Sequence, residues 1–211
     1  MFTGIIKELG EIKFLQRSSK YLKYSVLSEE ISQNTCLGAS IAIDGVCQTV
    51  TKIDKNELFF EAIDETLKKT SLGSLKLEQK VHLEPALAFG DPLDGHLVSG
   101  HVDTQGKVIS INKTPGRFDV KVSVPSDISK YIIKGGSICL SGVSLTVFDV
   151  DHSSCSVSLI PETLKRTNFN TLSPSSPLNI EVDTIGKWIE KLLLHEKSNH
   201  SLENKLRSML E

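Results

Sequence analysis

Residues 38–51 read GASIAIDGVCQTVT, and residues 135–148 read GGSICLSGVSLTVF. Seven of these fourteen positions are identical at an offset of 97. The same offset aligns ETLKKT at 65–70 with ETLKRT at 162–167 and, after a slip of one residue, GIIKELGEI at 4–12 with GHVDTQGKV at 100–108. Self-similarity at a fixed spacing is the signature of an internal repeat. The sequence therefore predicts two copies of one unit, over residues 1–95 and 96–184.

Each copy contains short stretches that are typical of β-strands. Apolar or β-branched residues alternate with polar ones in KYSVLS at 23–28, ELFFEAI at 57–63, FDVKVSV at 118–124 and CSVSLI at 155–160. Glycine-bearing turns separate about six such stretches in each copy, which favours a small closed barrel because closure removes exposed sheet edges. We expect an all-β fold of two similar six-stranded antiparallel barrels in tandem.

Two polar stretches indicate short helical turns at a barrel end. They are SEEISQNT at 28–35 and PSDISKYIIK at 125–134, the second with Ser126 placed as an N-cap.

The pattern changes after Asp183. One apolar helical face is formed by positions i, i+3, i+4, i+7 and i+8, which are Ile185, Trp188, Ile189, Leu192 and Leu193. After EKSNH at 196–200, the same spacing continues with Leu202, Leu206, Met209 and Leu210, and Glu203 and Arg207 form an i,i+4 pair. We expect a helical segment over 185–211, packed either on its own barrels or in a bundle between subunits.

The charge balance narrows the classes of partner. With 24 Lys+Arg against 26 Asp+Glu, no basic surface for nucleic acid or an anionic membrane is indicated. MFTGII at 1–6 lacks the features of a signal peptide, and no apolar run is long enough to cross a bilayer. We expect a cytoplasmic protein whose partner is a small molecule or another copy of the chain.

The four cysteines, Cys36, Cys47, Cys139 and Cys155, include no Cys-x-x-Cys pair, which argues against a structural zinc site. We expect reduced thiols, and no metal.

Three elements recur in both copies: the Gly-Ile-Ile or Gly-His-Val opening, the Gly-Val-Cys/Ser-x-Thr turn and strand, and the Glu-Thr-Leu-Lys segment. Small barrels bind ligands at the mouth, where strand ends offer backbone N–H and C=O groups. These groups suit a flat heterocycle with amide-like edges. We expect two related ligand sites in each chain.

His101 is the acid/base candidate, because an imidazole titrates near neutrality; the alternative is a hydrogen-bonded structural histidine. His96 and His101 do not share a face at helical or strand spacing, so a metal pair is disfavoured. Ser144 lacks the second glycine of a nucleophile elbow. Cys47 would need a nearby positive charge to act as a thiolate, and a packed cysteine is the alternative.

Five motifs together resemble the alpha chain of the riboflavin synthase family. They are MFTGII at 1–6, DGVCQTV at 44–50, DGHLVSGHVD at 94–103, SGVSLTV at 141–147 and LIPETLKRT at 159–167. The resemblance implies two Greek-key barrels and a homotrimer formed through the C-terminal helices. It places each active site between the first barrel of one subunit and the second barrel of a neighbour.

The resemblance implies a dismutation that uses no cofactor. Two molecules of 6,7-dimethyl-8-ribityllumazine react, and one transfers a four-carbon unit to the other. The products are riboflavin and 5-amino-6-ribitylamino-uracil. Association with lumazine synthase is a further implied possibility, and the alternative function is a non-catalytic lumazine or flavin carrier.

Candidate site residues follow from the same resemblance. The first implied pocket is lined by Gly4, Ile5, Ile6, Cys47, Gln48, Thr49, Glu61, Ala62, Ile63, Asp64, Glu65 and Thr66. The second is lined by Gly100, His101, Val102, Lys134, Ser144, Leu145, Thr146, Ser158, Leu159, Ile160, Pro161, Glu162 and Thr163. The implied catalytic residues are Phe2, Thr3, Cys47, His101, Ser144 and Thr146.

The chain departs from the family pattern at three of its positions. Asp44 and Ser141 stand where the family often carries Asn and Asp, and Gln48 replaces a leucine.

Overall fold

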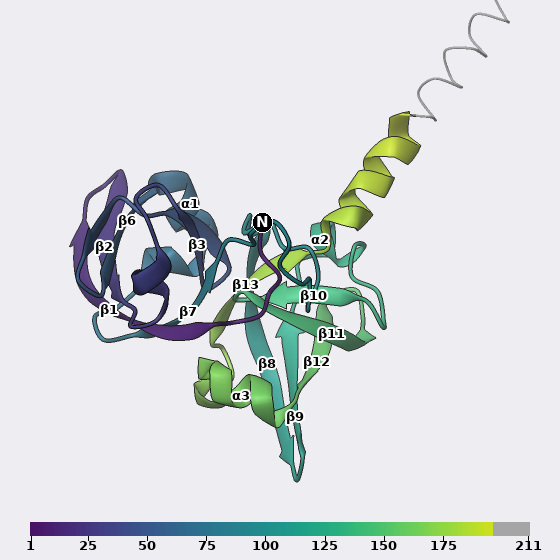
Figure 1. Cartoon of the computed structure of the whole chain (residues 1–211). Coiled ribbons are helices and arrows are strands. Elements are labelled where there is room, and N and C mark those ends of the chain that lie inside the picture. The colour runs from purple at the N-terminus through teal and green to yellow at the C-terminus, as the bar shows by residue number, and fades with distance from the viewer. Residues whose placement is uncertain (196–211) are drawn as a thin grey trace, which may run out of the picture.

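A computed structural model of the chain describes residues 1–195. Two β units lie in tandem, and a helix over 184–195 projects from the second (Figure 1). Within the described residues, no helix is long and apolar enough to cross a membrane. The predicted helical positions Leu202, Leu206, Met209 and Leu210 and the pair Glu203 and Arg207 lie outside the described residues.

The first unit is a seven-stranded antiparallel sheet in the order β4-β3-β7-β1-β2-β6-β5. Its strands are β1 (Glu8–Arg17), β2 (Tyr21–Leu27), β3 (Ser40–Ile43), β4 (Val46–Thr49), β5 (Lys52–Asp54), β6 (Glu57–Ile63) and β7 (Lys80–Pro85). Only Val50 and Thr51 separate β4 from β5, so the two ends of the sheet are consecutive in the chain. The sheet therefore curls into a barrel-like unit (Figure 1).

The second unit is a closed six-stranded barrel in the order β10-β11-β12-β9-β8-β13. Its strands are β8 (Thr104–Thr114), β9 (Arg117–Ser123), β10 (Ser137–Leu140), β11 (Val143–Val150), β12 (Ser154–Leu159) and β13 (Pro177–Val182). The strand β11 runs unbroken where the first unit has β4 and β5. The consecutive strands β9 and β10 are not neighbours in the barrel, which is the type of connection found in a Greek key. The predicted all-β fold with two barrel units is confirmed.

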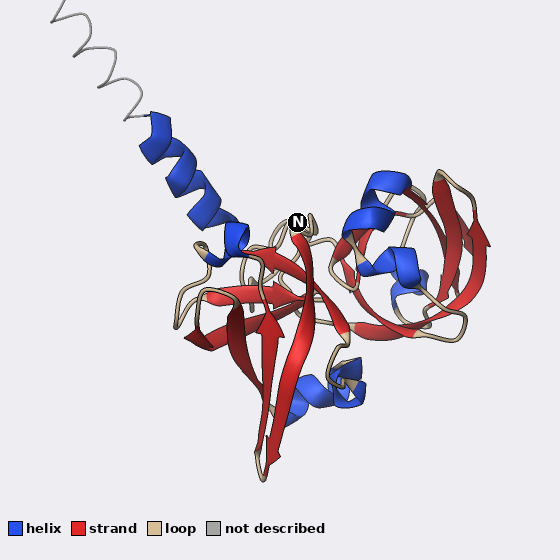
Figure 2. Cartoon of the chain, turned by 180° about the vertical axis from the view of Figure 1, so that it is seen from behind, coloured by secondary structure: helices blue, strands red, loops and turns tan. Residues whose placement is uncertain are grey.

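Short helices lie at the margins of both units (Figure 2). They are η1 (Ile31–Asn34), α1 (Asp64–Lys69), η2 (Ser71–Ser74), α2 (Ser126–Ser129), α3 (Pro161–Arg166) and η3 (Asn168–Thr171). The predicted helical turns at 28–35 and 125–134 are confirmed as η1 and α2. The predicted cap is wrong: Pro125 occupies the N-cap position and Ser126 is the first helical residue.

The repeated Glu-Thr-Leu-Lys segments form α1 and α3, and the same residue type ends both. The Thr70 hydroxyl donates to the Thr66 carbonyl at 2.7 Å and accepts from the Leu72 N–H at 3.3 Å. Thr167 makes the equivalent contacts in the second unit. Each threonine thus closes its α-helix and caps the 3-10 turn that follows, so both segments end in the same way.

The two units meet at their repeated turns. A Cβ atom on Gly45 would lie 2.5 Å from the Gly142 nitrogen, so only glycine permits this approach. The flanking positions Asp44 and Ser141 are buried and belong to a polar network between the barrels. The two turn positions that depart from the family pattern therefore lie in the contact between the units.

That network joins equivalent strands of the two units. On β7, the His82 N–H donates to Asp44 Oδ1 at 2.8 Å, and His82 Nδ1 lies 2.7 Å from the Ser141 carbonyl oxygen. On β13, Asn179 Nδ2 donates to the Asp44 carbonyl and to Ser71 Oγ, both at 2.8 Å. Burial raises the pKa of the Asp44 carboxyl, and His82 opposes that rise. The contact is therefore held by specific hydrogen bonds as well as by close packing.

Candidate active site

The opening segments of the two copies are exchanged between the barrels. The Ser144 N–H on β11 donates to the Gly4 carbonyl at 2.8 Å, and the Cys47 N–H on β4 donates to the Gly100 carbonyl at 2.9 Å. Ile6 is buried in the core of the second barrel, and Val102 in the core of the first. Each opening segment therefore lies against the other copy's strand.

This exchange defines two sites. The name Cys47 pocket is used for the region where β4 contacts residues 100–102, and the name Ser144 pocket for the region where β11 contacts residues 4–6. The predicted grouping, which placed residues 4–6 beside Cys47 and residues 100–102 beside Ser144, is wrong. The physical reason is that the sequence repeat aligns equivalent segments but does not encode which copy each one contacts.

Glycine is required at both crossing points. Gly4 and Gly100 have φ angles of +76° and +78°, in the left-handed region. A Cβ on Gly4 would lie 2.7 Å from the Ser144 nitrogen, and one on Gly100 would lie 2.6 Å from Cys47 Cβ. The close contact of backbone with strand explains why both copies open with glycine.

The Cys47 pocket contains a cavity of about 240 Å³ between β4, α1 and the second opening segment. Its lining includes six of the predicted site residues, which are Cys47, Glu65, Thr66, Gly100, His101 and Val102. His101 is exposed, and its N–H donates to Ser99 Oγ at 3.1 Å. The structure thus brings the acid/base candidate and the thiol to one cavity.

Lys69 also lines this cavity and was not predicted as a site residue. Its side chain thus places a positively charged group in the lining of the same cavity as Cys47. The repeat could have indicated Lys69, because the offset of 97 aligns it with Arg166 and both copies therefore carry a basic residue at this position.

The Ser144 pocket contains a serine–histidine pair. His96 Nδ1 lies 2.7 Å from Ser144 Oγ. His96 is buried, and this burial lowers its pKa against the opposing influence of Asp183 and Glu181. A neutral imidazole at this distance can take a proton from the hydroxyl or orient it. The sequence drew attention to His96 only as an unsupported metal ligand, because nothing in it indicated contact with Ser144.

The strand positions beside Cys47 and Ser144 divide into an exposed pair and a buried pair. Thr49 and Thr146 are exposed, whereas Gln48 and Leu145 point into the barrels and are buried. Gln48 Oε1 accepts a hydrogen bond from the Tyr24 hydroxyl at 3.2 Å. The side chain that departs from the family's leucine is therefore engaged inside the first barrel.

Phe2 and Thr3 lie in the contact between the two copies. Phe2 is fully buried against Ala42, Val98 and Cys139. Thr3 is buried, and its hydroxyl donates to Glu84 at 2.7 Å. The hydroxyl's contact identifies Thr3 as an anchor of the opening segment.

The remaining predicted residues occur at equivalent places in the two units. Glu61, Ala62 and Ile63 end β6, and Asp64, Glu65 and Thr66 begin α1. Ser158 and Leu159 end β12, Ile160 follows, and Pro161, Glu162 and Thr163 begin α3. Ile63 and Ile160 are 59% and 63% exposed, so each strand-to-helix junction presents an exposed apolar side chain. Lys134 is exposed in the turn before β10.

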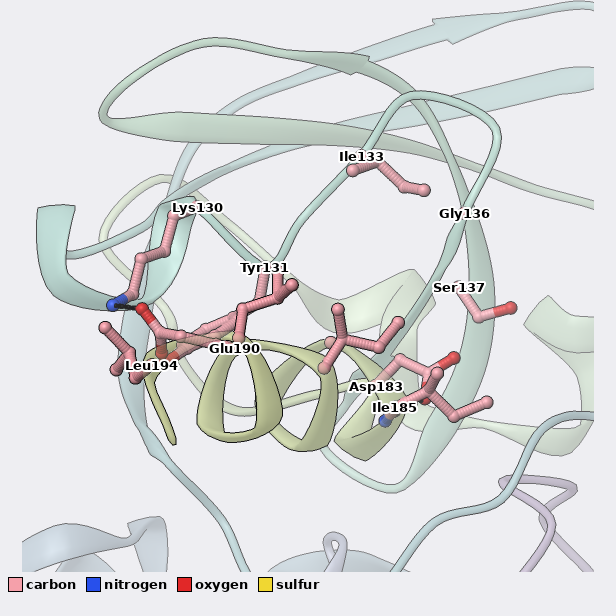
Figure 3. Close-up of a pocket in the computed structure, with 12 residues that line it drawn as sticks. Lys130, Tyr131, Ile133, Gly136, Ser137, Asp183, Ile185, Glu190 and Leu194 are labelled. Carbon is pink, nitrogen blue, oxygen red and sulfur yellow. Dashed lines mark hydrogen bonds and ion pairs between the residues drawn. The ribbon is translucent and has the colours of Figure 1, made fainter. Parts of the chain in front are cut away.

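A larger groove of about 610 Å³ lies between the C-terminal helix and the second barrel (Figure 3). Lys130 and Tyr131 both contact Glu190 of the helix, and the Lys130 Nζ–Glu190 Oε1 distance is 2.5 Å. Apolar side chains such as Ile133, Ile185 and Leu193 line much of the groove. It has no counterpart in the first copy, so it does not account for the duplicated chemistry.

The helix itself is only partly covered by its own barrel. Lys187 Nζ lies 2.6 Å from Asp103 Oδ1, which fixes the start of the helix. Trp188 and Leu192 nevertheless remain 68% and 67% exposed.

The sequence matches the lumazine binding domain family over residues 3–86 and again over residues 99–183. It is 39% identical over 208 residues to riboflavin synthase of Actinobacillus pleuropneumoniae, covering 96% of this chain and 97% of that protein. The chain belongs to the riboflavin synthase family. A second member of the family, riboflavin synthase of Bacillus subtilis strain 168, is 34% identical over 210 residues, with 100% and 98% of the two chains covered.

Solved structures show the same fold at lower identity. LumP complexed with riboflavin is 23% identical, with a TM-score of 0.81 and coverage of 87% of this chain and 100% of that chain. LumP complexed with 6,7-dimethyl-8-(1'-D-ribityl) lumazine is also 23% identical, with a TM-score of 0.79 and coverage of 86% and 99%. The family match confirms the duplication read from the sequence, because two domains match in tandem.

Proposed function

We propose that this chain is a riboflavin synthase. Two molecules of 6,7-dimethyl-8-ribityllumazine react, and transfer of a four-carbon unit gives riboflavin and 5-amino-6-ribitylamino-uracil. The observation that carries the proposal is a pair of related sites in one chain, each with its own polar side chains. Cys47, His101 and Lys69 line a cavity in the first, and Ser144 contacts His96 at the equivalent strand position of the second. The curated relatives that match the full chain length carry the same activity in their names.

The proposed reaction requires only two substrate molecules and titratable side chains. The two lumazines together contain every atom of the two products, so no external oxidant or group donor enters. One lumazine must lose a proton from its acidic 7-methyl group, and a nucleophile or water must add to the ring of the other. The histidines are the groups suited to proton transfer at neutral pH.

The pockets supply orientation as well as acid/base groups. Holding two identical rings in reacting geometry converts an encounter in solution into an intramolecular step, which can provide much of the acceleration. Backbone groups of the opening segments and the exposed residues Thr49 and Thr146 would bind the same heterocycle in both pockets. The differing residues, Cys47 and Ser144, would allow one molecule to donate and the other to accept.

The reacting pair is proposed to form between subunits of a homotrimer. His101 opens to the surface of the chain, so a second lumazine could approach from a neighbouring subunit's Ser144 pocket. The exposed apolar side chains of the helix over 184–195 support its use in assembly. The proposed cytoplasmic location rests on the sequence features given above, and the proposed association with lumazine synthase rests on the family resemblance.

The test is turnover by the purified chain given 6,7-dimethyl-8-ribityllumazine and no cofactor. We expect a yellow product with flavin absorbance, with two lumazines consumed for each riboflavin formed. Binding of lumazine without product at any pH between 6 and 8 would reject the enzyme and favour a carrier.

A further inference from the structure

Two buried carboxylates occupy equivalent positions in the two barrels. Glu84 on β7 and Glu181 on β13 are 3% and 4% exposed. Neither forms an ion pair with a lysine or arginine within the described residues. A buried carboxylate without a cationic partner must be stabilised by hydrogen bonds, and in both cases the donors come from an opening segment.

The two sets of contacts match atom for atom. Glu84 Oε1 accepts from the Thr3 N–H and hydroxyl, both at 2.7 Å, and Oε2 accepts from the Gly4 N–H at 3.0 Å. Glu181 Oε1 accepts from the Ser99 N–H and hydroxyl, both at 2.7 Å, and Oε2 accepts from the Gly100 N–H at 3.0 Å. Each carboxylate thus receives three hydrogen bonds from two adjacent residues, which fixes the position and orientation of that dipeptide.

The dipeptide held by each carboxylate continues directly into the other barrel's pocket. The carbonyl of Gly4, whose own N–H donates to Glu84, accepts a hydrogen bond from the Ser144 N–H of the second barrel. The Gly100 carbonyl accepts from Cys47 of the first barrel, and the Ser99 hydroxyl also accepts from the N–H of His101. The carboxylate, the opening segment and the reactive strand therefore form one continuous chain of hydrogen bonds from barrel to barrel.

We infer that Glu84 and Glu181 are positioning residues that act across the barrels: Glu84 of the first barrel builds the Ser144 pocket, and Glu181 of the second barrel builds the Cys47 pocket. The inference rests on the proposed function, in that both pockets bind the lumazine ring. Replacing either glutamate by glutamine keeps the side-chain volume but turns one acceptor oxygen into a donor that faces backbone N–H groups. The opening segment it holds would then lose its fixed position.

The experiment measures each pocket separately by thiol protection. Of the four cysteines, Cys139 and Cys155 are buried, so Cys36→Ser leaves Cys47 as the one accessible thiol. The probe is 6-methyl-7-oxo-8-ribityllumazine, which lacks a 7-methyl group and cannot turn over. Its dissociation constant at the Cys47 pocket is read from the slowing of iodoacetamide alkylation, followed by intact mass.

Each glutamate serves as the matched control for the other. In the Cys36→Ser background, Glu181→Gln should raise the dissociation constant at Cys47 about tenfold or more, as for loss of a hydrogen bond to a charged group. Glu84→Gln should leave it within about twofold, the range expected for a residue that makes no contact with this pocket. The second pocket is measured with a thiol introduced by Ser144→Cys in a chain that also carries Cys36→Ser and Cys47→Ser. At this thiol, Glu84→Gln should raise the dissociation constant about tenfold or more, and Glu181→Gln should leave it within about twofold.

Folding is followed in the same samples by thermal unfolding. If Glu181→Gln fails to fold, Ser99→Ala replaces it. This variant removes the hydroxyl that donates to Glu181 and accepts from the His101 N–H, and the backbone N–H groups of residues 99 and 100 still bind the carboxylate. It should also raise the dissociation constant of the probe at Cys47. Equal effects of Glu84→Gln and Glu181→Gln on Cys47 would overturn the inference, as would no effect of either. Absence of protection in the parent chain would instead reject lumazine binding at this pocket, and with it the proposed function.

Discussion

The crossing glycine Gly100 allows a prediction whose magnitude follows from the structure. Gly100→Ala forces an alanine into φ +78°, which costs about 1–2 kcal/mol. Its Cβ would also lie 2.6 Å from Cys47 Cβ and 3.0 Å from the Cys47 nitrogen, inside normal contact distance. Relief of that contact requires the segment to move and the hydrogen bond from the Cys47 N–H to break, at a further cost of about 1 kcal/mol. The expected loss of stability is about 2–3 kcal/mol.

Gly38→Ala is the matched control. Gly38 has φ +81° and no atom within 4 Å of an added Cβ, so it isolates the backbone strain. Urea denaturation should show a loss of about 1–2 kcal/mol for Gly38→Ala and about 1 kcal/mol more for Gly100→Ala. Because the displaced segment carries His101, kcat/KM should fall about a hundredfold for Gly100→Ala alone. If both variants lose the same stability and Gly100→Ala keeps its activity within twofold, the reasoning is wrong.

Three further predictions address the remaining parts of the molecule. His101→Ala should lower kcat about a hundredfold or more while changing lumazine affinity little, and equal losses of both would make it a binding residue. Burial lowers the pKa of His96 below its usual 6.5. As the pH falls below 6.5, the histidine is therefore protonated in the unfolded chain before it is protonated in the folded chain, and the free energy of unfolding decreases. Urea midpoints should therefore drop more steeply from pH 7 to 5 for the parent than for His96→Asn, and parallel curves would contradict this. Deletion of residues 184–211 should reduce the assembly to monomer or dimer by light scattering, and an unchanged mass would show that the tail does not hold the oligomer.

The repeat made the fold predictable because period-2 alternation and paired turns recur at a fixed offset. The contact partners were not predictable in the same way. Gly4 and Gly100 align with each other in sequence, and nothing in that alignment states that each contacts the strand of the opposite copy. Exchange of the openings is a property of tertiary packing, so the predicted residues could be named while their grouping was wrong.

Side chains whose partners lie far along the chain were missed for a related reason. Ser144 and His96 are 48 residues apart and their pairing depends on how the opening segments cross. The departures at Asp44 and Ser141 were visible in the sequence, but their burial against His82 and Asn179 depends on the contact between barrels. Periodicity identifies which face of a strand is buried, and does not identify which barrel covers it.

We propose that every chain has two working pockets, each built from both copies. The most direct measurement is the number of 6-methyl-7-oxo-8-ribityllumazine molecules bound per chain at saturation, determined by equilibrium dialysis. Two bound molecules per chain are predicted, and in Glu181→Gln one of the two should bind about tenfold or more weakly than the other. One bound molecule per chain in the parent protein would contradict the account and favour a carrier with a single site.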